Sequence, residues 1–137
     1  MKELTVKALT ENLDEVTRFV DEELEAAECT MKVQMQVELA VEEIFVNIAN
    51  YAYSPEVGTA TVSVELTDDG ALLRIVFKDK GTPYDPTAKV DPDVTLSAQD
   101  RQIGGLGIFM TKKSMDNVSY EYKDGQNILT LEKKIMG

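Results

Sequence analysis

Two segments of alternating apolar and polar residues, each broken by an Asp-Gly turn, constrain the fold of this chain most strongly. A period of two is typical of strands that bury one face, and Asp-Gly favours the tight turn of a β-hairpin. The strands that the alternation predicts are residues 59–66, 71–78, 118–122 and 128–135. Their connecting turns are Asp68-Asp69-Gly70 and Asp124-Gly125, so the sequence predicts two antiparallel hairpins.

Two helices are predicted before the first hairpin, because apolar residues recur there at three- and four-residue spacing. The first spans about 10–29, with Thr10 and Asn12 as candidate N-caps, and the second spans about 31–53. The buried stripes expected are Leu13, Val16, Val20, Leu24 and Ala27, then Val37, Val41, Ile44 and Ile48. With an opening strand over residues 4–8, these elements favour an α+β fold. We expect a two-layer sandwich of a mixed, largely antiparallel sheet with helices on one face.

Composition and charge limit the classes of partner. The chain has 137 residues, 43% of them hydrophobic, which suits a single domain over residues 1–137. A net charge of −11 argues against nucleic acid as a partner and favours a basic protein. The absence of a bilayer-length apolar run and of an apolar leader predicts a cytoplasmic chain without membrane attachment. Cys29 is the single cysteine and histidine is absent, which excludes an internal disulfide, a structural zinc site and a phosphohistidine.

The second helix carries an acid and an amide one turn apart, Glu43 and Asn47. An Asn oxygen is a hard ligand that suits Mg²⁺ beside phosphates, and a neighbouring carboxylate can act as a general base. Both belong to a second, mostly polar line of residues beside the core stripe: Gln36, Ala40, Glu43, Asn47 and Asn50. Such a line either marks the edge of a buried face or lines a pocket, and Glu-x-x-x-Asn alone does not distinguish the two.

Two glycine motifs follow the helices. Asp79 ends a strand and precedes Gly81, so its carboxylate can accept a hydrogen bond from an exocyclic amine such as that of adenine. Taken alone, Asp-x-Gly is equally an ordinary turn at a strand end. Gly104-Gly105-Leu106-Gly107 opens a helix over residues 108–115, where exposed N–H groups favour phosphate, unless the glycines form a hinge. Between the motifs, residues 82–103 form a proline-containing loop, for which a ligand lid is the favoured interpretation over a disordered insertion.

In this order the three motifs resemble the GHKL ATPase fold, which is shared by gyrase, Hsp90, MutL and histidine kinases. The short length, with Asp79-x-Gly81-x-Pro83-Tyr84-Asp85-Pro86 and Gly104-Gly105-Leu106-Gly107-Ile108, is most similar to anti-sigma factor serine/threonine kinases. These are stand-alone, histidine-kinase-like ATPase domains of bacteria. The resemblance covers nearly the whole chain, from Leu4 to Ile135.

The resemblance implies a role for each motif. Glu43 would be the catalytic base and Asn47 the ligand of Mg²⁺, while Asp79 would hold adenine and Gly81 would give it room. The ATP-binding residues that it implies are Asn47, Asp79, Gly81, Tyr84, Arg101, Gly104, Gly105, Leu106 and Gly107. Arg101 would reach the terminal phosphate, although a surface arginine is an equal interpretation.

By the same resemblance, the chain is expected to be an ATP- and Mg²⁺-dependent switch kinase. It would transfer the γ-phosphate to a Ser or Thr of an anti-anti-sigma protein of the STAS type, and would sequester a sigma factor. A homodimer is implied by the family alone. The alternative from another class is a nucleotide-dependent protein-binding module without kinase activity. A third interpretation is the detached ATP domain of a histidine kinase, which would require a partner that carries the histidine.

Overall fold

Within the part of the chain that the structure describes, the sheet has five strands in the order β1-β2-β3-β5-β4, and each neighbouring pair is antiparallel. The computed structural model describes residues 2–53, 56–67, 70–83 and 105–135. The strands are β1 (Lys2–Lys7), β2 (Thr59–Thr67), β3 (Leu72–Asp79), β4 (Asn117–Lys123) and β5 (Gln126–Lys134). The predicted hairpins are therefore β2–β3 and β4–β5, and β5 joins them by pairing with β3.

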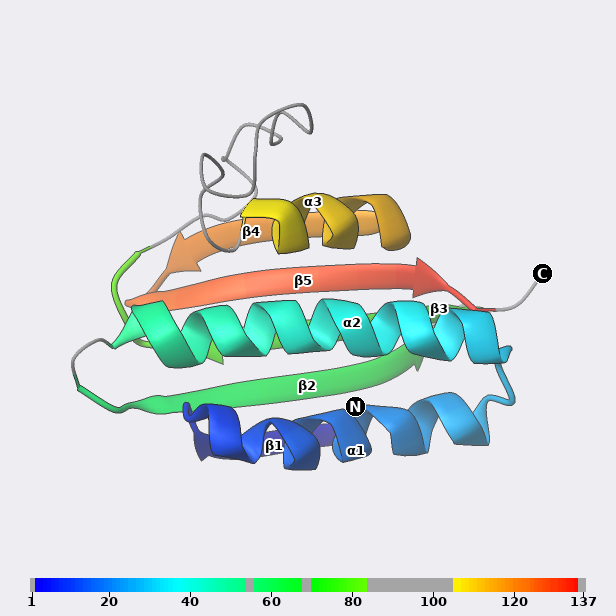
Figure 1. The fold of residues 1–137 in the computed structure, drawn as a ribbon, viewed down its shortest axis with the longest axis horizontal. Helices are drawn as coiled ribbons and strands as arrows, with labels where there is room; N and C mark the ends of the chain where they lie inside the picture. Colours follow the sequence, from blue (N-terminus) through cyan, green and yellow to red (C-terminus); the bar gives the residue numbers. More distant parts are fainter. Residues whose placement is uncertain (1, 54–55, 68–69, 84–104, 136–137) are drawn as a thin grey trace.

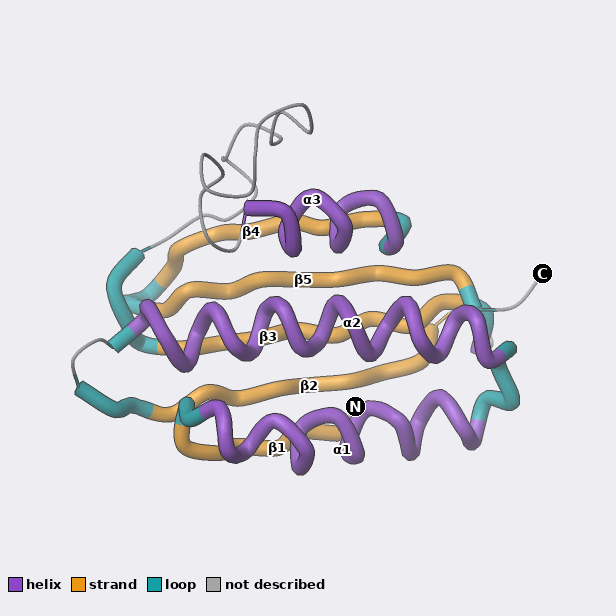
Figure 2. The backbone as a smooth tube through the Cα atoms, in the orientation of Figure 1, coloured by secondary structure: helices purple, strands orange, loops and turns teal. Residues whose placement is uncertain are grey.

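The described residues form three α-helices. These helices lie on one face of the sheet, as Figure 1 shows. They are α1 (Leu13–Ala26), α2 (Met31–Asn47) and α3 (Gly105–Ser114). In Figure 2, α2 runs along the middle of the sheet, with α1 on the β1–β2 side and α3 on the β4 side. The arrangement confirms the predicted α+β sandwich with helices on one face, and every strand pair that the structure describes is antiparallel. No helix within the described ranges has both the length and the apolar character to cross a membrane.

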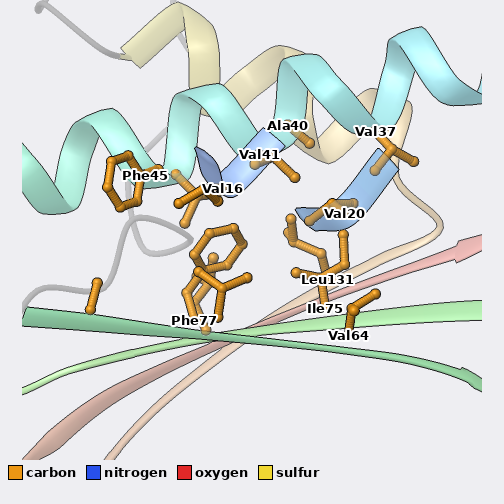
Figure 3. Close-up of a cluster of buried hydrophobic side chains, with 14 of the residues drawn as sticks. Val16, Val20, Val37, Ala40, Val41, Phe45, Val64, Ile75, Phe77 and Leu131 are labelled. Atoms are coloured by element: carbon orange, nitrogen blue, oxygen red, sulfur yellow. The ribbon is translucent and has the colours of Figure 1, made fainter. Parts of the chain in front are cut away.

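The hydrophobic core fills the space between helices and sheet, as Figure 3 shows. The predicted helical stripes supply its upper half, with Val16 and Val20 from α1 and Val41 from α2 fully buried. The sheet supplies Val64, Ile75, Phe77 and Leu131 from its inward-facing positions. Fully burying a side chain of this size contributes about 1.5–3 kcal/mol, so these apolar stripes fix which faces of the helices and strands meet.

The start of α1 differs from the prediction. Thr10 and Asn12 were the candidate N-caps, and both lie in a 3-10 turn (η1, Thr10–Asn12). Asn12 does occupy the N-cap position of α1, but its side chain makes no capping hydrogen bond. Asn12 has φ −93° and ψ 3°, not the extended backbone of a capping residue, and its Nδ2 donates to the carbonyl of Lys7 at 2.9 Å. By contrast, α2 does have a side-chain cap: Thr30 Oγ1 accepts from the N–H of Val33 at 3.2 Å.

The C-terminal end of α2 widens into a π-helical turn, η2 (Ile48–Ala52), which sequence patterns did not predict. Single π-turns are rare and occur often at functional sites. The next residue, Tyr53, fixes this turn to the sheet: its hydroxyl donates to the carbonyl of Thr59 and accepts from the N–H of Lys80, both at 2.7 Å. The end of the helix is thereby held against the start of β2 and the end of β3.

Candidate functional site

Glu43 and Asn47 lie one turn apart on α2, as predicted, and they contact each other. Asn47 Nδ2 donates to Glu43 Oε1 at 3.1 Å, and both side chains are partly buried. This bond uses the amide nitrogen of Asn47 and leaves the Oδ1 oxygen as an acceptor. Glu42, the neighbouring acid, is exposed. The helix therefore presents one carboxylate and one amide oxygen together, which is the donor chemistry that a hard cation prefers.

Asp79 ends β3 and is almost completely buried, with 6% of its surface exposed. Its Oδ1 accepts from the backbone N–H of Gly81 and from Asn127 Nδ2, both at 2.9 Å. Two amide donors offset part of the cost of burying the carboxylate. Because both bonds fall on Oδ1, Oδ2 is left as the acceptor that a ligand could use.

Asn127 is a site residue that the sequence interpretation missed. It is buried in β5 directly across the ladder from Asp79, and its Nδ2 also donates to the carbonyl of Thr82 at 3.0 Å. Its Oδ1 accepts from the hydroxyl of Tyr120 on β4. Asn127, Leu129 and Leu131 occupy alternate, inward-facing positions of β5. A polar amide in such an apolar row is a signal that could have marked Asn127 as a site residue.

A small cavity connects these polar groups. Its lining residues are Ile44, Asn47, Ile48, Ala52, Phe77, Asp79, Thr82, Tyr120, Asn127 and Leu129. Asn47 from α2 and Asp79 from β3 thus face the same space, between mostly apolar walls. The cavity measures about 50 Å³, well below the roughly 300–1,000 Å³ of small-molecule sites. A ligand of nucleotide size would therefore need the walls to separate, or would occupy the cavity with one end only.

Gly81 has a packing role in addition to the one predicted from the sequence. A Cβ atom at this position would lie 2.2 Å from the carbonyl oxygen of Ala52 in η2, which is closer than real contacts allow. The N–H of Thr82 donates to the same oxygen at 2.8 Å. The π-turn therefore packs directly on the chain that leaves β3, and glycine is what permits this approach.

Tyr53, which holds the π-turn, lies near the buried acid. Burial raises the pKa of the Tyr53 hydroxyl, and the charge of Asp79 raises it further. The hydroxyl stays protonated at neutral pH and keeps its bond to the carbonyl of Thr59. A Cβ at Gly58 would lie 2.2 Å from the Tyr53 ring, so the ring also packs closely against Gly58.

The structure describes three of the four residues of the third motif, Gly104-Gly105-Leu106-Gly107. The helix α3 begins at Gly105, so Gly105, Leu106 and Gly107 form its first turn, three residues earlier than the predicted start at 108. The remaining predicted ligand contacts, Tyr84, Arg101 and Gly104, lie outside the described residues, as does most of the predicted lid. Within the described ranges, no three His, Cys, Asp or Glu side chains gather as a metal site.

Comparison with protein families gives one match over most of the chain. The histidine kinase-like ATPase domain family matches residues 6–133. Among curated proteins, the serine/threonine-protein kinase BtrW of Bordetella bronchiseptica is 30% identical over 73% of this chain. The serine-protein kinases RsbW of Listeria monocytogenes and Bacillus cereus are 31% and 28% identical over 68% of it. The matched regions cover 70%, 61% and 59% of these relatives' own lengths, so the chain spans less than two thirds of both RsbW proteins.

Solved structures share the fold at low sequence identity. A histidine kinase domain from a blue-light activated kinase of Erythrobacter litoralis has a TM-score of 0.52 and 15% identity, and covers 76% of this chain and 45% of its own. The histidine kinase AdeS of Acinetobacter baumannii also has a TM-score of 0.52, with 10% identity, and covers 100% of this chain and 70% of its own. At these identities the likeness concerns the fold alone.

Proposed function

This chain belongs to the histidine kinase-like ATPase domain family, and we propose that it is an ATP-dependent protein serine/threonine kinase of the anti-sigma type. The observation that carries the proposal is the cavity in which the buried Asp79 carboxylate faces Asn47, the hydrogen-bond partner of Glu43. The proposed acceptor for the nucleobase (Asp79), the proposed cation ligand (Asn47) and the proposed base (Glu43) are thereby neighbours in one site. The names of the kinase relatives support the reaction class.

Adenine is the proposed occupant of the cavity. Asp79 Oδ2 accepts from the exocyclic amine, while Asn127 and the Gly81 N–H hold the carboxylate in place through Oδ1. The apolar walls, which include Ile48 and Phe77, suit the flat faces of a base. Since the cavity is small, entry of the base separates these walls.

Asn47 Oδ1 is the proposed protein ligand of Mg²⁺, which fits the site because Nδ2 is already used by Glu43. Bound there, Mg²⁺ would neutralise charge on the phosphate oxygens. Glu43 accepts the proton of the substrate hydroxyl. The N–H groups of the first α3 turn, Gly105–Gly107, bind the phosphates. The proposal extends the phosphate contacts to Gly104 and Arg101, and includes Tyr84 among the ATP-binding residues.

The proposed substrate is an anti-anti-sigma protein of the STAS type, with a sigma factor as the second partner. The relatives named serine-protein kinases support a protein substrate, and the net charge of −11 favours a basic or neutral surface on the partner. We place the chain in the cytoplasm, where such partners occur, and infer a homodimer from the family.

Glu43→Gln separates a kinase from a nucleotide-dependent binding module. The substitution keeps the shape and the contact with Asn47 but removes the base. We expect ATP binding to persist while transfer of labelled γ-phosphate to a purified STAS-type partner falls about 10²–10⁴-fold. Glu15→Gln is the control, because Glu15 is an exposed acid on α1 that does not line the cavity, and this variant should transfer at the wild-type rate. Wild-type chain that binds ATP and the partner but transfers no phosphate would support the binding module.

A further inference from the structure

A second hollow lies between α2 and α3, and Glu43 is one of its lining residues. We call it the α2–α3 groove. Its lining residues are Leu39, Ala40, Glu42, Glu43, Val46, Met110, Thr111 and Ser114, and it measures about 360 Å³. The two helices lie side by side on the same face of the sheet in Figure 1, and they contact each other.

The walls of this groove are unusually apolar for a surface. Leu39 is 62% exposed and Met110 is 53% exposed, and they approach the groove from opposite helices. Met31 and Met35 continue the line of Leu39 along α2 at four-residue spacing. These four make up most of the six large hydrophobic side chains exposed in the described residues. Exposed apolar residues that gather in one place mark interaction sites, and methionine adapts to varied partners.

Glu43 connects the groove to the proposed chemistry. It lines the groove, whereas Asn47, its hydrogen-bond partner, lines the nucleobase cavity. The pair therefore stands at the boundary between two spaces. If ATP enters from the Asp79 side, a hydroxyl in the groove reaches the Glu43 carboxylate without crossing the nucleotide.

The charges of the groove limit what can occupy it. Among its described lining residues, Glu42 and Glu43 carry acidic side chains, and none carries a basic one. The two glutamates would repel a carboxylate or a phosphorylated residue of the partner. A negative charge in the groove would also disfavour phosphoryl transfer to a hydroxyl next to it. An apolar side chain beside an uncharged or basic residue fits both the walls and the acids.

We propose that the α2–α3 groove is the docking site for the acceptor segment of the protein substrate. This inference rests on the proposed kinase function. The segment carries a Ser or Thr with apolar side chains that contact Leu39 and Met110, and it has no acidic residue next to the hydroxyl. The proton of the Ser or Thr hydroxyl passes to Glu43, and the oxygen of that hydroxyl forms a bond to the γ-phosphorus of ATP. The bond between the γ-phosphorus and the β–γ bridging oxygen breaks. ADP leaves and Glu43 ends protonated.

The test is the double variant Leu39→Gln, Met110→Gln, assayed with a purified STAS-type protein that the wild-type chain phosphorylates. Both side chains are exposed and glutamine suits helices, so the fold should persist. We expect KM for the protein substrate to rise at least tenfold, with ATP affinity and the rate at saturating substrate unchanged. Val57→Gln is the control, because Val57 is 57% exposed away from the groove and should keep the wild-type KM.

Two results overturn the groove and leave the kinase function standing. One is a double variant that keeps both the wild-type KM and the wild-type self-association, which would leave the groove without a role in docking. The other is a double variant that keeps the wild-type KM but loses self-association in sedimentation, which would assign the groove to a second copy of the chain. A wild-type chain that transfers phosphate to no STAS-type protein contradicts the proposed function itself, and the groove then loses its substrate.

Discussion

At the scale of single residues, the site depends on how one buried carboxylate is held. Asp79 is shielded from water, and its Oδ1 is bonded to the Gly81 N–H and to the amide of Asn127. The amide of Asn127 is in turn fixed by the carbonyl of Thr82 and the hydroxyl of Tyr120. Each group in this chain of bonds restricts the next, so the orientation of Oδ2 depends on residues that need not contact a ligand.

Asn127→Leu tests this dependence. Leucine has a similar volume but no donor, so it leaves the Asp79 carboxylate buried with one bond fewer. We expect the free energy of unfolding to fall by about 1–3 kcal/mol, the cost of an unsatisfied buried group. ATP affinity should fall about tenfold, as measured by calorimetry. Gln126→Leu is the control, since the preceding strand residue points to the opposite face. Wild-type stability and affinity in Asn127→Leu would contradict the positioning role.

Gly81→Ala separates a packing role from a ligand-contacting role. The added methyl would lie 2.2 Å from the Ala52 carbonyl oxygen, so the backbone of η2 or of β3 must move. Overpacking of this kind typically costs about 1–3 kcal/mol, and urea denaturation without nucleotide should show it. Thr82→Ala, which keeps the N–H bonded to Ala52, should change stability less. If the alanine at 81 weakens ATP binding but leaves stability unchanged, glycine serves the ligand alone.

At the scale of elements, α1 and α2 meet across an acidic contact. Burial raises the pKa of the Glu38 carboxyl on α2, and the bond and charge of Asp21 and the charge of Glu25 on α1 raise it further. Asp21 Oδ1 is buried and has no hydrogen-bond partner among the residues that the structure describes. The interface is therefore less stable with Glu38 ionised than with Glu38 protonated.

Glu38→Gln should relieve this repulsion. The folded chain binds the Glu38 proton more tightly than the unfolded chain, so stability falls as pH rises from 4.5, the ordinary value of glutamate, through the raised pKa. Glutamine stays neutral and can donate to Asp21. In urea denaturation we expect the free energy of unfolding to rise by about 0.2–1 kcal/mol at pH 7. This gain should shrink as the pH falls toward 4.5. Glu42→Gln on the same helix should give no such gain. Equal stability of Glu38→Gln and wild type at pH 7 would contradict the repulsion.

Local patterns predicted the elements well, because each pattern reports a half-buried face. The strand expected over residues 59–66 is Thr59–Thr67, and the helix expected from about residue 31 begins at Met31. The start of α1 was missed because Asn12 bonds back to the carbonyl of Lys7, five residues earlier, instead of capping the helix. The π-turn was missed because the Tyr53 hydroxyl beside it bonds to Lys80, 27 residues away, and no local pattern encodes that contact. Asn127 was missed for the same reason: it bonds to a residue 48 positions away, across a β3–β5 pairing that no local pattern encodes.

At the scale of the whole molecule, helices on one face leave the other face of the sheet to water. Arg74 in β3 bridges Glu65 in β2 and Glu132 in β5 there, with N–O distances of 2.9 and 2.8 Å. Such polar pairs keep the outer face compatible with solvent, and the apolar residues gather under the helices. The site lies at the edge of that core, where the ends of α2 and β3 meet the start of β5. Ligand binding there acts on the contact between the helical layer and the sheet.

The central claim, that this edge is an ATP site anchored by Asp79, is tested most directly by calorimetric titration of ATP and Mg²⁺ into the wild-type chain and Asp79→Ala. Removing the acceptor leaves the adenine amine unpaired in a buried place, which costs about 1.5–3 kcal/mol. We therefore predict saturable binding by wild type and a roughly tenfold to hundredfold weaker affinity in the variant. Asp116→Ala, a substitution of an exposed acid outside the cavity, should bind like wild type. Equal affinities of wild type and Asp79→Ala would contradict the claim.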